Sequence, residues 1–116
     1  MKKFLWYWAP VILYAGLIFY LSSIPITGLP GPGPAAFRDK YWHLLEFFVL
    51  AALLLRAGQG YRWRHAYYFA ILFAILYGAL DELHQSFVPG RVASIVDAAM
   101  DGVGALCVLV FKKWKR

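Results

Sequence analysis

The stretch AYYFAILFAILYGAL, residues 66–80, carries no charge and is followed at once by Asp81 and Glu82. A helix needs about 20 mainly apolar residues to cross a hydrocarbon layer about 30 Å thick. Three more apolar stretches of similar length occur, and the four predicted helices cover residues 4–23, 41–57, 66–87 and 94–111. The sequence therefore predicts an all-α, polytopic membrane protein, a four-transmembrane-helix bundle that forms a single domain over residues 1–116.

The composition favours the same class. Of the 116 residues, 62% are hydrophobic and only 16% are charged, and the mean hydropathy is +0.58. A soluble domain of this length carries more charge and less apolar surface. The net charge is +6, but the basic residues flank the apolar stretches, which favours a membrane surface and argues against nucleic-acid binding.

The basic residues also predict the orientation in the membrane. Nine of the twelve lysines and arginines precede the first stretch, surround the loop at residues 58–64 or follow the last stretch. Only Arg38, Lys40 and Arg91 are left for the opposite side. Because cytoplasmic loops are enriched in lysine and arginine, we expect an N-in, C-in topology with both termini in the cytoplasm.

The acidic residues lie on the other side. All six belong to the outer loops or to the outer halves of the predicted helices: Asp39, Glu46, Asp81, Glu82, Asp97 and Asp101. The helical rise places the acids within the second and third helices, Glu46, Asp81 and Glu82, about 8–9 Å below the helix ends. Ionisable groups within a span are costly and usually face a polar interior. We therefore expect one polar cavity that opens to the outside, although ion pairs of single acids with Arg91 or Lys40 are a simpler structural alternative.

The spacing of the polar residues supports a shared cavity. Steps of three and four residues place each of three groups along one helix face. The groups are Asp39, His43 and Glu46; Tyr77, Asp81 and Gln85; and Ser94, Asp97, Asp101 and Gly104. Gly102 and Gly104 are also expected to let the fourth helix pack closely against a neighbour.

A metal site is a second interpretation of the same region. Imidazole nitrogen and carboxylate oxygen suit zinc, manganese or iron, so the candidate ligands of a divalent metal are His43, Glu46, Asp81 and His84. The pairs His43/Glu46 and Asp81/His84 have the i, i+3 spacing found in carboxylate-bridged metal bundles. Such pairs are frequent by chance, and a hydrogen-bonded histidine near the membrane interface is the simpler alternative.

Several motifs point to a known family. They are Asp39-Lys40-x-x-His43, Asp81-Glu82-x-His84-Gln85-x-Phe87-x-Pro89-x-Arg91 and Ser94-x-x-Asp97, preceded by Tyr20-Leu21-Ser22-Ser23. In this order, and over nearly the whole chain, they resemble the VanZ-like family. The resemblance implies a multi-pass protein of the bacterial cytoplasmic (inner) membrane, a site at its outer face and a link to glycopeptide (teicoplanin) susceptibility. It implies no settled biochemical activity, and Asp101 stands where we expect the family to have asparagine.

The residues and the resemblance together favour a site that binds or modifies an envelope lipid, phosphorylated or glycosylated, or a cell-wall precursor. The candidates for acid–base catalysis are Asp81, Glu82, Asp97 and His43. The candidates for binding are Asp39, Lys40, Glu46, His84, Gln85, Arg91, Ser94 and Asp101, with Arg91 and Lys40 expected to hold phosphate. The alternatives are a metal-dependent membrane enzyme and a non-enzymatic interaction module or ion-coupled carrier.

The topology can be tested with single cysteines at Gly33 and Gln59 in a Cys107→Ser background. These positions fall on opposite sides of the membrane if the basic residues set the orientation. A membrane-impermeant thiol reagent should therefore label Gly33→Cys from outside intact cells and Gln59→Cys only after permeabilisation. Labelling of both cysteines from the same side contradicts the predicted topology.

Overall fold

The computed structural model describes residues 2–23, 35–88 and 95–111, and it describes the side chains of residues 2–23, 41–88 and 95–111. These residues form helices joined by turns, which confirms the predicted all-α class. The helices are α1 (Lys2–Ser22), α2 (Ala35–Gly60), α3 (Ala66–Gln85) and α4 (Ile95–Leu106), and α4 continues into the 3-10 helix η1 (Cys107–Leu109). Three of them are long and apolar enough to cross a membrane: α1, α2 over Tyr41–Gly60, and α3.

All four helices differ from the predicted ranges, and α2 and α4 differ most. α2 begins at Ala35 instead of residue 41, because the helix continues through a more polar segment ahead of its apolar stretch. An apolar stretch marks the part of a helix that suits a bilayer and not the whole helix. α4 is a shorter α-helix than expected, since its winding tightens to 3-10 geometry at Cys107.

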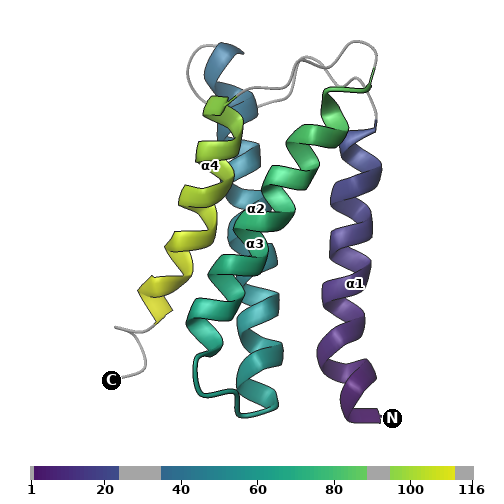
Figure 1. Ribbon diagram of the computed structural model, residues 1–116, viewed down its shortest axis with the longest axis vertical. Helices are drawn as coiled ribbons and strands as arrows, with labels where there is room; N and C mark the ends of the chain where they lie inside the picture. Colours follow the sequence, from purple (N-terminus) through teal and green to yellow (C-terminus); the bar gives the residue numbers. More distant parts are fainter. Residues whose placement is uncertain (1, 24–34, 89–94, 112–116) are drawn as a thin grey trace.

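The helices α2, α3 and α4 pack together, and α1 lies along one side of them (Figure 1). Their shared core includes Phe47, Leu50 and Val108. Only three residues of α1 are buried, whereas its Leu13 side chain is 73% exposed. The wide apolar surface of α1 suits contact with lipid chains, and it leaves few contacts that hold α1 to the other helices.

Small residues let the core helices approach one another closely. Every fourth residue of α3 from Ala66 to Gly78 is an alanine or glycine, and all of them are buried. On α4, a β-carbon added to Gly104 would collide with the backbone carbonyl of Leu44 in α2. Close approach through small residues is typical of helix interfaces in membranes.

The turn between α2 and α3 closes with a residue in the left-handed conformation. Arg62 has a φ of 57°, and its N–H donates to the carbonyl of Gln59 at 3.0 Å. The N–H of Trp63 donates to the carbonyl of Gly58 at 2.9 Å. These two bonds form a Schellman motif, which satisfies carbonyl groups that the end of a helix leaves open.

The close approach of α4 to α2 predicts unequal effects of alanine at two glycines. Gly104→Ala should destabilise the protein by about 1–3 kcal/mol, because the new methyl group meets backbone that cannot move aside. Gly102→Ala is the matched control, since its methyl group would lie 3.9 Å from the nearest atom, in Ile75. Thermal unfolding in detergent measures both changes, and equal melting temperatures would contradict the packing of α4 against α2.

Candidate acidic and histidine site

The bundle has one strongly polar end, where α1 and α3 end and α2 and α4 begin (Figure 1). We call this the polar end. All buried polar or charged side chains of the described residues belong to it or to the helix turns next to it: Ser22, His43, Asp81, Glu82, Gln85, Asp97 and Asp101. They come from all four helices, and the half-buried Glu46 lies one turn along α2 from His43. The structure therefore concentrates its buried polar groups in one region.

One side of α3 connects to α1. The side chains of Tyr77, Asp81 and Gln85 recur every four residues, and each of them meets α1. Tyr77 Oη donates to the carbonyl of Ala15 at 2.5 Å. Ser22 Oγ donates to Asp81 Oδ1 and accepts a hydrogen bond from Gln85 Nε2, at 3.3 Å from Gln85. These bonds hold the end of α1 against the polar end of α3.

A second connection joins α2 to α4. His43 Nδ1 lies 2.8 Å from Asp101 Oδ1, and the Asp101 side chain has no exposed surface. The other carboxylate oxygen of Asp101, Oδ2, has no hydrogen-bond partner within the described residues. This oxygen lies close to α3, since a β-carbon on Gly78 would sit 3.2 Å from it. Gly78 thus makes room for a fully buried carboxylate.

His43 belongs to two groups of side chains that are suited to metal binding. One group contains His43, Asp81 and Asp101, and the other contains His43, Glu82 and Asp97. All five residues are buried, and within each group the ligand atoms lie within 4.8 Å of one another. Nitrogen and oxygen ligands in this mixture suit zinc, manganese or iron, and the same carboxylates can also exchange protons with a bound ligand.

Not every predicted ligand belongs to these two groups. His84 belongs to neither group: its Nε2 lies 2.9 Å from Ser23 Oγ, and its ring stacks on Phe19 with 4.3 Å between centroids. Glu46 belongs to neither group within the described side chains. Their predicted roles stay predictions, as do those of four residues outside the described side chains: Asp39, Lys40, Arg91 and Ser94.

Ser22 is a site residue that the sequence predictions omitted. Its side chain is only 3% exposed and contacts both Asp81 and Gln85. Paired serines at the end of an apolar helix, just before Pro25, were a signal that could have revealed it. A serine that ends a membrane helix has its hydroxyl available for a neighbouring helix.

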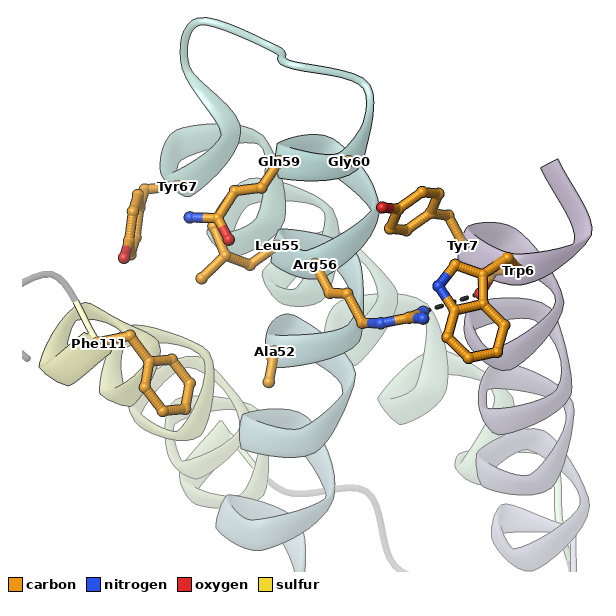
Figure 2. A pocket seen from close by; sticks show the side chains of 9 residues that line it. All are labelled: Trp6, Tyr7, Ala52, Leu55, Arg56, Gln59, Gly60, Tyr67 and Phe111. Carbon is orange, nitrogen blue, oxygen red and sulfur yellow. Dashed lines mark hydrogen bonds between the residues drawn. The ribbon is translucent and has the colours of Figure 1, made fainter. Parts of the chain in front are cut away.

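The described lysines and arginines lie toward the opposite end of the bundle: Lys2, Lys3, Arg56, Arg62 and Arg64. A cavity of about 630 Å³ opens there between α1, α2, Tyr67 of α3 and Phe111, which follows η1 (Figure 2). Arg56 Nη1 donates to the carbonyl of Trp6 at 2.8 Å, and its guanidinium lies 4.8 Å from the centre of the Trp6 ring. Arg56 thus anchors α1 to α2. None of these five cations lies at the polar end, so none of them neutralises the negative charge of its carboxylates.

Fold and site define a small helical membrane protein with buried carboxylates and a histidine at one end. The family model described as VanZ/LLP1 matches residues 7–116. The chain therefore belongs to the VanZ-like family, as its motifs indicated. No curated protein and no solved structure matches the chain significantly.

The contact between Ser22 and Asp81 predicts a loss of stability in Ser22→Ala. A hydrogen bond to a charged group contributes about 1.5–3 kcal/mol, so the variant should lose an amount in this range. Ser86→Ala is the control, because Ser86 is exposed and bonds only within α3, to the carbonyl of Leu83. Unfolding in detergent measures both; if Ser22→Ala is as stable as Ser86→Ala, the contact between α1 and α3 is not a stabilising one.

Proposed function

We propose that the chain spans the bacterial cytoplasmic membrane four times, with both termini in the cytoplasm and the polar end outside. All lysines and arginines of the described side chains lie toward one end, and all of the acids lie toward the other, a distribution that supports this orientation. The helical segment 95–111, formed by α4, η1 and the two residues after it, is roughly 25 Å long at the usual rise per residue. This length is close to the thickness of the hydrocarbon layer.

The polar end, in this proposal, binds the head group of an envelope lipid or cell-wall precursor from the outer leaflet. One observation carries the proposal: buried polar side chains from all four helices converge at one end of a bundle whose outer surface is apolar. Lipid chains can lie against that apolar surface while the head group reaches the polar side chains. Intramembrane ionisable groups that face a bundle interior usually mark such functional sites.

Ion pairs of single acids with Arg91 or Lys40 are the structural alternative. Carboxylates and the Gln85 amide can instead accept or donate hydrogen bonds to the hydroxyl groups of a glycosylated head group. The sequence predicts that Lys40 and Arg91 lie on the same side of the membrane as the carboxylates. These two residues are the proposed contacts of a phosphate group. The family's link to teicoplanin, a drug that acts on cell-wall precursors, supports the same class of ligand.

Lipid retention tests the proposal. The protein, purified in mild detergent, should carry an envelope lipid that native mass spectrometry detects. Asp97→Asn and Arg91→Lys should each reduce this lipid severalfold, because they alter the polar end and its proposed phosphate contact. Arg64→Lys, at the opposite end, should leave the amount unchanged, and all three variants should be checked for similar melting temperatures.

Two outcomes would count against lipid binding. If the unmodified protein retains no envelope lipid, the proposal fails and a non-enzymatic interaction module becomes the better interpretation. If Arg64→Lys lowers retention as much as Asp97→Asn does, the lipid binds elsewhere. Loss of folding in Arg91→Lys, with unchanged lipid in the remaining folded protein, would assign Arg91 a structural role.

A metal-dependent membrane enzyme is the second candidate function. The specific observation in its favour is that His43 shares two groups of ligand atoms with carboxylates of α3 and α4. A metal ion can activate water and stabilise charge on a transferring phosphoryl group. Conversion of the co-purified lipid after Mn²⁺ is added to chelator-treated protein would support this function, and an unchanged lipid would count against it.

A further inference from the structure

The side chains around His43 indicate that the polar end binds a second ligand, in addition to the proposed lipid head group. Four buried carboxylates surround this histidine in two groups, Asp81 with Asp101 and Glu82 with Asp97. Imidazole nitrogen and carboxylate oxygen together suit a divalent transition metal. The arrangement of these ligand atoms therefore favours a bound metal ion.

Asp101 supplies a second and independent indication. It is fully buried, and only its Oδ1 is engaged, by His43 Nδ1 at 2.8 Å. Its Oδ2 has no hydrogen-bond partner within the described part of the chain. A buried acceptor without a partner costs free energy, and a metal ion is a partner that carboxylate oxygen binds well.

The distances agree with a metal site. Two ligand atoms of one ion, each about 2.0–2.2 Å from it, lie at most about 4.4 Å apart. The ligand atoms of each group already lie within 4.8 Å of one another, so small side-chain movements bring them onto one ion.

We propose that the polar end binds a divalent transition-metal ion, with His43 as the nitrogen ligand. The oxygen ligands come from the two groups that share His43, Asp81 with Asp101 and Glu82 with Asp97. The mixture of imidazole and carboxylate favours Mn²⁺, Fe²⁺ or Zn²⁺ over Mg²⁺ or Ca²⁺, which prefer oxygen alone. His84 stacks on Phe19 and belongs to neither group, so the proposal does not include it among the ligands.

The ion deepens the proposed function of the same site. A cluster of carboxylates repels an anionic phosphate, whereas a bound divalent cation attracts it and has coordination positions that phosphate oxygens can fill. Only this step, the attraction of a phosphate group by the metal ion, rests on the proposed lipid function. Binding of the metal itself depends on the five side chains and can be measured without any lipid.

The test uses the full chain in detergent, freed of lipid and stripped of metal with a chelator. Mn²⁺ alone is titrated and its binding followed by electron paramagnetic resonance, with Zn²⁺ as a competitor. The three histidines of the chain provide matched variants. His43→Asn should weaken metal affinity at least about tenfold, the range seen when ligands or their supporting groups are changed. His84→Asn and His65→Asn should bind Mn²⁺ as the unmodified protein does.

Asp101→Asn provides a second variant in case His43→Asn does not fold. It keeps the shape of the side chain and removes a buried charge. We expect weaker Mn²⁺ binding, together with a melting temperature of the metal-free protein that is unchanged or higher. A lower melting temperature with unchanged Mn²⁺ affinity would show that Asp101 only supports the fold, and would overturn its role as a ligand.

The remaining outcomes also decide the proposal. Absence of saturable Mn²⁺ or Zn²⁺ binding to the unmodified protein overturns it, and so does equal affinity in His43→Asn and His65→Asn. Metal binding without any retained envelope lipid would leave the metal site intact and refute the proposed lipid function. Lipid retention that a chelator does not affect, in a protein that binds no metal, would refute the metal site alone.

Discussion

The burial of several carboxylates in an otherwise apolar helical bundle is the constraint on which the rest of the structure depends. Each of these groups needs a partner from a neighbouring helix, since the bilayer interior supplies none. Ser22 meets Asp81 from α1, and His43 meets Asp101 from α2. The polar groups thus specify which helices must be neighbours at this end, while apolar packing alone would allow many rotations of each helix.

Close backbone contacts make these polar contacts possible. Gly104 lets α4 approach the backbone of α2 at Leu44, the residue next to His43. One turn earlier in α4, Asp101 fits against Gly78 of α3. Side chains larger than glycine at these two positions would move α4 outward and carry Asp101 away from His43. The glycines therefore act on the site by setting how close the helices are.

Periodicity and charge distribution were enough to predict the helical class, the concentration of acids toward one end and the sets of residues that share a helix face. They did not determine which neighbour each face meets. Asp81 and His84 are three residues apart, yet Asp81 lies in the cluster around His43 whereas His84 stacks on Phe19 of α1. The paired serines could have marked Ser22 as a polar residue at a helix end, but not its contact with Asp81, because that contact depends on how far α1 extends beside α3. These features arise from helix rotation and translation, which a single sequence does not specify.

The two ends of the bundle are stabilised by different interactions, and this difference bears on function. At the end near Arg56, aromatic rings and a cation hold α1 to α2: Tyr7 packs on Gly60, and Arg56 lies over Trp6. Such contacts are satisfied within the protein. At the polar end, like charges are brought together and Asp101 keeps an oxygen that the described residues leave without a partner. Proteins keep unfavourable local contacts, such as neighbouring like charges, mainly at functional sites. Favourable contacts elsewhere in the fold have to offset the stability that such a site loses. Here the aromatic end and the small-residue interfaces of α3 and α4 can provide these contacts, which agrees with the polar end as the proposed functional site.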